Sequence, residues 1–425
     1  MSTQIRKDSS PLSRKPKNIK NYNQRLVLSL LRKYSQMTAS EISERINLSI
    51  TSVTKILAAL FKQNLVKSMG KGNSTEEGGK KPELFAINDT YKYVISVCCG
   101  GNHNHCAIST LKCEIINTCH FQYQDSENFE KCMNEISAVI EKLVTDTGLQ
   151  PSNIWGIVVS FDGIVDAENG VLLFPIHNTA WGRNLKAREV LQELLSEYKN
   201  ISINNGSRLS GYAEFLKHPD YAEDNVLVIA SGSFTGGCVL DYGKMIQGAN
   251  GFVGEVGHIT VAPTNRSEKC ACGNYGCFET MISPEALIKF AKELKKDYPN
   301  SALYPSLDQI DYEEVFRASN QQDAFACRVM DQIIAYFVLL IRNIVLIYDP
   351  KVIVLQGIYT QAGDYFLTTL QKEIHSLPFF KIEKELKIVY SDLSYSHGYF
   401  IGGALYLADQ FFNEADLFVE QEDND

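Results

Sequence analysis

Three cysteines and a histidine form the part of the sequence whose residue types and spacing carry the clearest chemistry. Cys270, Cys272 and Cys277 lie within eight residues, and His258 stands twelve residues before Cys270. Three thiolates and one imidazole make a tetrahedral ligand set that suits structural zinc, and the glycines between the cysteines let the backbone turn tightly. The alternative is a cysteine-rich turn beside an unrelated histidine. We predict one structural zinc ion on this set.

Two acidic residues flank the predicted metal ligands. Glu255 precedes His258 by three residues, and Glu279 follows Cys277 by two. A metal that fixes the histidine and the cysteine also fixes these carboxylates, and the second ring nitrogen of the histidine stays available as a donor. Two carboxylates and an imidazole N–H can hold the hydroxyls of a sugar or another polyol. The alternative is a pair of ordinary surface acids.

The same stretch resembles a known family. Gly-Glu-Val-Gly-His at residues 254–258, followed by Cys-x-Cys-Gly-x-x-Gly-Cys-x-Glu at residues 270–279, is similar to the signature of the ROK family of repressors, open reading frames and sugar kinases. The resemblance extends from about residue 20 to about residue 410. It implies a two-lobed, actin-like α/β fold of the ribonuclease-H-like ATPase type, with the zinc motif as one wall of a sugar site. The sugar-binding positions that it implies are Gly163, Asn205, Glu255, His258 and Glu279.

The chemistry of the family's kinases is altered in this sequence. The aspartate that acts as general base in those kinases is matched here by Gly206. Cys98 and Asn102 replace the acid and the threonine of the first phosphate-binding turn, and Asp162 stands where the family usually has proline. A general base contributes about 10²–10⁴ to a rate, and glycine cannot accept a proton. We therefore predict that the chain has no catalytic residue and is not an enzyme.

Charge is divided unevenly along the chain. Residues 1–87 carry 16 Lys and Arg against 6 Asp and Glu, whereas the remaining residues carry 25 against 44. A basic front on an acidic body predicts a polyanionic partner for the front alone.

The basic front has the spacing of a winged helix–turn–helix. A leucine-rich helix begins near Asn21, Thr38 and Glu41 form a capping box, and Ser49 caps a third helix. Two short strands joined by a polar loop follow as a wing, and Gly-Gly-Lys-Lys-Pro at residues 78–82 resembles the winged domain of ROK repressors. The alternative is a small helical bundle for protein contacts. The residues predicted to bind DNA are Ser49, Thr51, Ser52, Thr54, Lys55, Lys71, Lys80 and Lys81.

These patterns give a complete domain plan. An all-α winged helix–turn–helix domain over 21–88 precedes the two lobes, with a disordered basic tail before it and an acidic tail at 414–425. The first lobe takes 89–205 plus 396–413, and the second takes 206–395 and contains the zinc motif. Eleven cysteines without a disulfide pattern and a polar N-terminus predict a cytoplasmic protein. The longest apolar run contains Arg342 and is too short to span a bilayer, so no membrane partner is expected.

The predicted function is that of a DNA-binding transcriptional regulator, a repressor, that senses a sugar or sugar derivative through a catalytically inactive, sugar-kinase-like body. Its expected partners are a double-stranded operator with an inverted repeat, a sugar effector and a second copy of the chain in a homodimer or higher homo-oligomer. Two alternatives stay open: an active ROK sugar kinase with a DNA-binding arm, and a regulator whose body has lost small-molecule binding.

Overall fold

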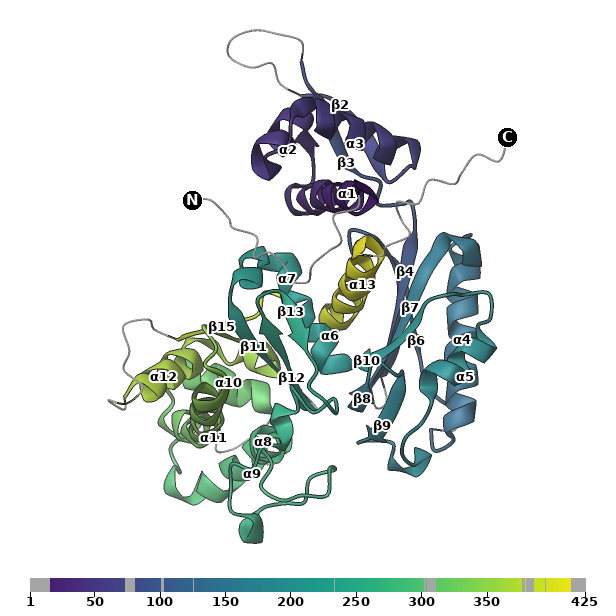
Figure 1. The fold of residues 1–425 in the computed structure, drawn as a ribbon. Helices are drawn as coiled ribbons and strands as arrows, with labels where there is room; N and C mark the ends of the chain where they lie inside the picture. The colour runs from purple at the N-terminus through teal and green to yellow at the C-terminus, as the bar shows by residue number, and fades with distance from the viewer. Residues whose placement is uncertain are drawn as a thin grey trace. The chain divides into compact units, whose positions relative to one another are not determined.

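The chain forms two compact units, the smaller from Met1–Lys92 with Ala408–Asp425 and the larger from Tyr93–Leu407. The structure, a computed structural model, describes residues 16–72, 81–100, 103–124, 126–232, 234–301, 303, 311–376, 379, 386–393 and 395–413 (Figure 1). The two predicted tails, except for residues 16–20, therefore lie outside the described residues, as do Lys80 and Asn102.

The smaller unit is a three-helix domain with a small sheet. Its elements are α1 (Pro16–Tyr34), β1 (Met37–Thr38), α2 (Ala39–Ile46), α3 (Ile50–Lys62), β2 (Val66–Lys71) and β3 (Glu83–Ile87). The strand order is β1-β3-β2, with antiparallel pairing throughout. The predicted wing strands are therefore present, and β1 is a third strand that the sequence pattern did not reveal.

Local capping determines where these helices begin. The Thr38 hydroxyl accepts from the backbone N–H of Glu41, and the Glu41 carboxylate accepts from the Thr38 backbone N–H at 2.7 Å, which confirms the capping box. Ser49 caps α3 as predicted, because its hydroxyl accepts from the Ser52 backbone N–H. Helix α1 begins at Pro16, earlier than the predicted start at Asn21.

The end of the last helix packs with the smaller unit. Asp409 forms an ion pair with Arg32 at 2.6 Å, and the same arginine lies 4.7 Å from the centre of the Phe412 ring. Phe411 contacts Tyr91 with ring centroids 6.1 Å apart. Residues 408–413, which the sequence plan assigned to the first lobe, therefore belong structurally to this unit.

The larger unit contains two five-stranded sheets of the same topology. The first has the order β10-β7-β4-β5-β6 and the second the order β13-β12-β11-β14-β15. In each, a three-stranded antiparallel meander is extended by two parallel strands. This repeated arrangement is the predicted two-lobed architecture.

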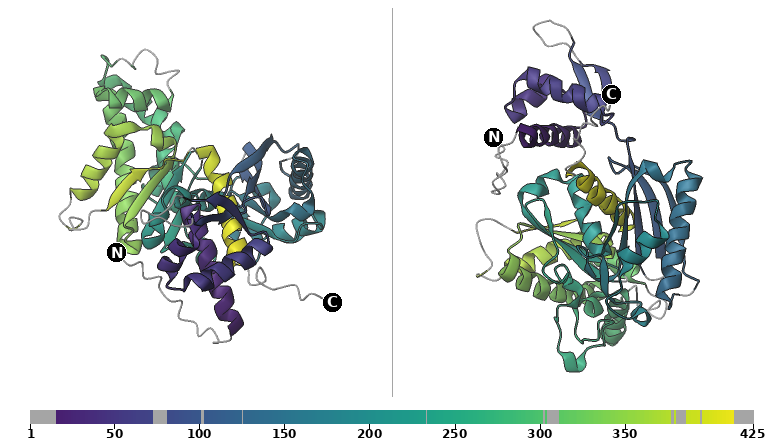
Figure 2. Two further views of the ribbon diagram at one scale, coloured as in Figure 1. Left: turned by 90° about the horizontal axis from the view of Figure 1, so that it is seen from above. Right: turned by 45° about the vertical axis from the view of Figure 1, so that its right-hand side comes forward.

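The first sheet is built from β4 (Tyr93–Gly100), β5 (His103–Thr110), β6 (Ile115–Phe121), β7 (Ile154–Phe161) and β10 (Ile201–Asn205). Helices α4 (Phe129–Asp146) and α5 (Ala187–Leu194) cover one face, and α13 (Tyr395–Asn413) lies on the other (Figures 1 and 2). Alternate apolar side chains such as Ile95, Val97 and Val159 pack under α4 and α5 in one core. The hairpin β8 (Gly163–Asp166) and β9 (Val171–Pro175) projects from the end of β7.

The second sheet is built from β11 (Asn225–Ser231), β12 (Thr235–Asp241), β13 (Lys244–Ile246), β14 (Val352–Gly357) and β15 (Lys387–Tyr390). Its second core joins alternate side chains of β11 and β14 to α8 (Phe278–Ile282), α9 (Pro284–Leu294), α10 (Tyr312–Asn320), α11 (Ala324–Tyr348) and α12 (Gly363–His375). Helix α11 is long and apolar enough to cross a membrane by length and composition alone. Its apolarity is explained by this core, because residues such as Phe337 and Ile341 are fully buried in it.

Helix α6 (Gly206–Tyr212), which is followed by the short α7 (Glu214–Lys217), lies between α13 and the second sheet. At the contacts, glycines allow the three elements to approach closely. A Cβ atom on Gly402 of α13 would lie 1.7 Å from the Leu209 carbonyl oxygen, and one on Gly211 would lie 2.3 Å from the Cys238 Cβ on β12. We call these contacts the glycine seam. It places the backbone of α13 directly against the backbone of α6, and the backbone of α6 against the side chains of the second sheet, at the junction of the two lobes.

Candidate functional site

The cysteines and the histidine predicted to bind metal converge in the second lobe. His258 ends a short 3₁₀ helix, Val256–His258, and Cys277 stands immediately before α8. Their one-atom ligand positions, together with those of Cys270 and Cys272, all lie within 4.8 Å of one another. Gly276 has φ of +71° and a Cβ there would lie 2.3 Å from the Ala262 carbonyl oxygen, so this turn requires glycine.

The spacing of these atoms fits a tetrahedral metal site. The sulfur atoms of Cys272 and Cys277 are 3.7 Å apart, and the Cys270 sulfur is 3.5 Å from Nδ1 of His258. Zinc bonds of about 2.3 Å to sulfur and about 2.0–2.1 Å to nitrogen give tetrahedral edges of roughly 3.8 and 3.6 Å. Burial raises the pKa of the Cys277 thiol to about 11, a cost that a bound cation would offset by stabilising the thiolate. The cluster can hold a metal ion.

The two predicted acids lie beside this cluster. Oε2 of Glu255 is 3.9 Å from Nε2 of His258, the ring nitrogen that does not face Cys270. Glu279 is buried, with one carboxylate oxygen 3.6 Å from the Cys270 sulfur and the other accepting from the Thr235 backbone N–H at 2.7 Å. The group of three cysteines and His258, together with the start of β12, therefore contacts both carboxylates.

Asn205 connects this wall to the first lobe. Its side-chain amide donates to the Gly163 carbonyl oxygen at 2.9 Å and to Oε1 of Glu255 at 3.3 Å, while its oxygen caps α6 at Arg208. Gly163 has φ of +154°, and a Cβ there would lie 2.2 Å from the Phe174 carbonyl oxygen. The structure thus brings together all five positions that the sequence singled out for sugar binding.

Three further residues of this site were not predicted. Arg208 is 1% exposed and donates to Oδ1 of Asn204 at 3.3 Å and to the Gly251 carbonyl oxygen at 3.0 Å. The rings of His177 and Phe234 are in contact, with centroids 3.5 Å apart and planes tilted by 32°, and burial lowers the pKa of His177 to about 4. Neither residue was assigned a role from the sequence, although Arg208 lies only two residues after Gly206.

Asp162 is the third unpredicted residue and lies among the acids. Burial, with repulsion from Glu279, raises the pKa of Asp162 to about 7. Burial also raises the pKa of Glu255 to about 7, against the opposing effect of the Arg208 guanidinium. The sequence marked Asp162 only as a departure from the family pattern. The structure makes it part of a cluster of three carboxyls.

The positions that match kinase chemistry remain without acids. Gly206 begins α6 directly after β10, and Cys98 is buried in β4 with its thiol pKa raised mainly by that burial. Strands β11 and β12 form an antiparallel pair.

The predicted DNA-contacting residues on α3 form an exposed face. Ser49, Thr51, Ser52, Thr54 and Lys55 are all exposed, as are Lys71 at the end of β2 and Lys81. The hydroxyls of Ser49 and Ser52 are 2.9 Å apart, and the Thr54 hydroxyl donates to the Ile50 carbonyl oxygen. Thr54 therefore uses its donor within the helix, and Thr51 and Lys55 are the better-placed outward groups.

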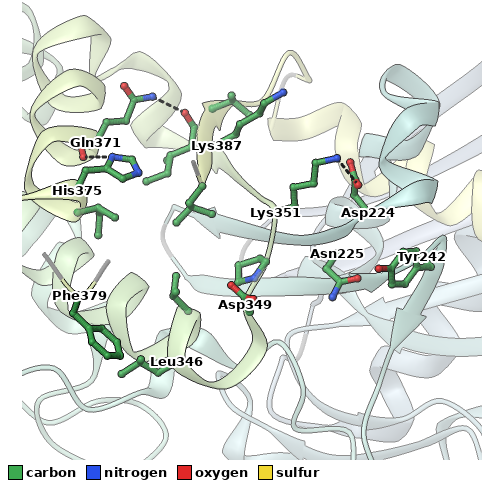
Figure 3. A pocket seen from close by; sticks show the side chains of 16 residues that line it. Asp224, Asn225, Tyr242, Leu346, Asp349, Lys351, Gln371, His375, Phe379 and Lys387 are labelled. Carbon is green, nitrogen blue, oxygen red and sulfur yellow. Dashed lines mark hydrogen bonds and ion pairs between the residues drawn. The ribbon is translucent and has the colours of Figure 1, made fainter. Parts of the chain in front are cut away.

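A separate pocket of about 1170 Å³ lies at the other end of the strands of the second sheet, away from the acid cluster (Figure 3). Its lining includes Asn225, the first residue of β11, and Lys351, which directly precedes β14, whereas the acid cluster lies toward the other ends of these strands. Lys351 pairs with Asp224 at 2.6 Å, and His375 Nδ1 lies 2.8 Å from the Gln371 carbonyl oxygen. Leu346 and Phe379 on its rim are 60% and 75% exposed. This pocket contains none of the predicted site residues.

Comparison with known proteins agrees with the two-unit architecture. The chain is 26% identical over 378 residues to the xylose repressor of Caldicellulosiruptor bescii, which spans 88% of this chain and 92% of that protein. It is 27% identical over 293 residues to a glucokinase of Halalkalibacterium halodurans, which spans 68% of this chain and 87% of the kinase. The kinase match thus leaves a larger part of this chain uncovered.

Solved structures support the same fold. A ROK family transcriptional regulator, described as a homolog of the Escherichia coli MLC protein, superposes with a TM-score of 0.73 at 22% identity. The match covers 92% of this chain and 97% of that one. Residues 20–72 match the model of the MarR family, and residues 94–410 match the model of the ROK family. The chain therefore belongs to the ROK family.

Proposed function

We propose that the chain is a DNA-binding transcriptional regulator, a repressor, whose body senses a sugar or sugar derivative. The observation that carries the proposal is the exposed N-terminal face of α3, where Thr51, Ser52 and Lys55 are presented by a winged helix–turn–helix. Hydroxyls and lysines are groups that bind base edges and phosphates, and the N-terminal residues of a recognition helix enter the major groove. The repressor among its relatives, matched over most of both chains, supports this reading.

Sugar sensing is assigned to the acid cluster between the lobes. Asn205 and Glu255 are hydrogen-bonded to each other, and His258 and Glu279 extend the same wall. Carboxylates and amides bind the hydroxyls of polyols, and a site between two lobes can change their relative orientation when a ligand fills it. Zinc on His258 and the three cysteines has a structural role here, because it fixes the wall that carries the acids.

The body is proposed to be catalytically inactive. Gly206 leaves no side chain at the position that matches the kinase base, and Cys98 cannot supply the acid of the phosphate turn. Because a glucokinase is also among the relatives, the absence of turnover has to be measured directly.

The functional form is proposed to be a homodimer, or a higher homo-oligomer, in the cytoplasm. One winged domain reads few base pairs, and two-fold pairing demands an inverted-repeat site with half-sites one or two helical turns apart. Helix α11 exposes Leu339, Leu346 and Ile347 by 45%, 60% and 87% on the outside of the second lobe. A second copy of the chain is the partner that these residues are proposed to meet.

Selection from a random duplex pool with the full-length protein tests the proposal. We expect an inverted repeat to be enriched, with Lys55→Ala weakening binding to every sequence and Thr51→Ala relaxing preference at particular positions. Lys62→Ala, at the other end of the same helix, is the matched control and should change binding little. Enrichment without symmetry, or equal binding by all three variants and the wild type, would contradict the proposal.

A further inference from the structure

The three parallel strands of the first sheet end in a row that contains a single side chain. Cys99 of β4 and Asn205 of β10 both pair with Phe161 of the central strand β7. One residue further along, β4 supplies Gly100, β10 leads to Gly206, and β7 leads to Asp162. Parallel neighbours in one row lie about 4.8 Å apart. Asp162 therefore stands between two residues that have no side chain.

The Asp162 carboxylate occupies the space beside both glycines. A Cβ on Gly206 would lie 3.4 Å from Oδ1 of Asp162, and a Cβ on Gly100 would lie 3.0 Å from Oδ2. The ring of Tyr399 from α13 limits the space at Gly206 on another side, at 3.2 Å. A larger residue in either glycine position would crowd the carboxylate, so the two glycines give Asp162 its room.

The three carboxyls of the site differ in what the protein offers them. Glu279 accepts from the Thr235 backbone, and Glu255 accepts from the Asn205 amide. Among the residues that the structure describes, Asp162 has neither a hydrogen-bond donor nor an ion-pair partner, although it is only partly exposed. An acceptor held away from bulk water without a donor costs free energy, and a ligand that brings hydroxyl donors would offset that cost.

We propose that Asp162 is a ligand-binding carboxylate that accepts hydrogen bonds from a hydroxyl of the effector, in the space left open by Gly100 and Gly206. The inference rests on the proposed sugar-sensing function and names the residue and the ligand class. When they are ionised, the carboxylates of Asp162, Glu255 and Glu279 together repel an anion, because like charges at close range are unfavourable. The effector class is therefore a neutral polyol or sugar, and phosphorylated sugars are excluded from this site.

Calorimetric titration of the full-length protein tests this assignment, with D-xylose, D-glucose, N-acetyl-D-glucosamine and glucose 6-phosphate as the probes. We expect at least one neutral sugar to bind and glucose 6-phosphate to bind more weakly than glucose. Asp162→Asn keeps the shape of the side chain but removes its charge. It should lower the affinity for the sugar by at least about tenfold, since hydrogen bonds to charged groups are the stronger ones. Glu168→Gln, an exposed acid in the adjoining hairpin turn, should change affinity less than about twofold by the same argument.

A relocation of the acid adds an independent readout. Gly206→Asp would place a second carboxylate next to Oδ1 of Asp162, so the single variant should bind sugar more weakly. The double variant Asp162→Ala with Gly206→Asp removes the conflict and should recover part of the affinity. Unfolding curves for each variant show whether a loss of binding reflects a loss of fold.

The outcomes separate this inference from the function beneath it. Equal affinity in the wild type and Asp162→Asn overturns the role of Asp162 and leaves sugar sensing intact, and so does tighter binding by the Gly206→Asp single variant. Preference for glucose 6-phosphate over glucose overturns the ligand class. Failure of the wild type to bind every neutral probe overturns both the inference and the proposed sugar sensing.

Discussion

Replacement of one cysteine gives a direct test of the predicted metal centre. In Cys272→Ser a hydroxyl, which is a poor zinc ligand, replaces the sulfur that lies 3.7 Å from the Cys277 sulfur. The remaining ligands are two sulfurs and a histidine nitrogen. Structural zinc sites bind with about 10–16 kcal/mol over four ligands, so an equal share per ligand is about 3–4 kcal/mol. That share corresponds to a loss of roughly 10²–10³ in affinity.

The assay is competition for zinc with a chromophoric chelator, after purification of the protein without added metal. The wild type should contain close to one equivalent of zinc and release it slowly, whereas Cys272→Ser should lose it at a much lower chelator concentration. Cys327→Ser is the matched control: this thiol contacts the Ser319 carbonyl oxygen on α10 and belongs to no metal-ligand cluster in the described part of the chain. It should keep the wild-type zinc content.

Two results would refute this reasoning. A wild-type protein that contains no zinc under non-chelating conditions would mean that the four ligand atoms converge for another reason. Equal resistance to the chelator in Cys272→Ser and the wild type would mean that the 3.7 Å sulfur pair does not belong to the coordination shell.

Four further predictions concern catalysis, DNA, pH and packing. Purified protein with ATP and each neutral sugar should give no sugar phosphate in a coupled assay, and robust turnover would show that Gly206 does not disable the site. Lys55→Ala should lower the slope of log K against log salt by about one unit, measured by fluorescence anisotropy on the selected duplex; an unchanged slope would remove Lys55 from the interface. The pKa of Asp162 is raised to about 7 from 3.8, so the folded state retains a proton that the unfolded state releases, and this contribution to stability is lost as pH rises from about 4 through 7. In urea unfolding, the free energy of unfolding of Asp162→Asn relative to that of the wild type should therefore increase as the pH is raised from 5 to 8. A difference that stays constant with pH would argue against the raised pKa. Gly402→Ala should lower the unfolding midpoint despite a helix-propensity gain of about 1 kcal/mol, because its Cβ meets the Leu209 carbonyl; Asn343→Ala, exposed on α11, is the propensity control and should not lower it.

Features encoded over a few consecutive residues were predictable from the sequence. The capping box at Thr38 and the cap at Ser49 depend on contacts within one helical turn, and both are present. The convergence of the three cysteines and His258 was also predictable from the sequence, since the three cysteines lie within eight residues and glycine sets the turn between them. The short strand β1 was missed because two residues leave no periodicity, and helix α10 was missed because its nine residues place the buried Val315 and Phe316 among charged residues.

Features that depend on the alignment of distant segments could not be predicted. The row that places Asp162 between Gly100 and Gly206 arises from the register of three strands, and its first and last residues are more than 100 residues apart in the sequence. The burial of Arg208 depends on a carbonyl from Gly251, in the loop between β13 and the 3₁₀ helix Val256–His258. A local sequence pattern does not indicate contacts between residues that are distant in the sequence. Only the folded chain shows that the carboxyl cluster has three members.

The glycine seam and the glycines of the Asp162 row have opposite consequences for how this protein can diverge. At Gly402 and Gly211 a side chain would meet a backbone carbonyl or the Cβ of the opposing strand, so variants at these positions are removed by loss of stability whatever ligand the protein binds. At Gly206 the nearest atoms, at 3.2–3.4 Å, belong to two side chains, those of Tyr399 and Asp162. An exchange there, accompanied by a change at residue 162, alters the hydrogen-bonding groups of the site without disturbing the junction of the lobes. Under the proposed sugar-sensing function, the same fold can therefore acquire a new effector through paired substitutions at two positions while the packing between its lobes stays unchanged.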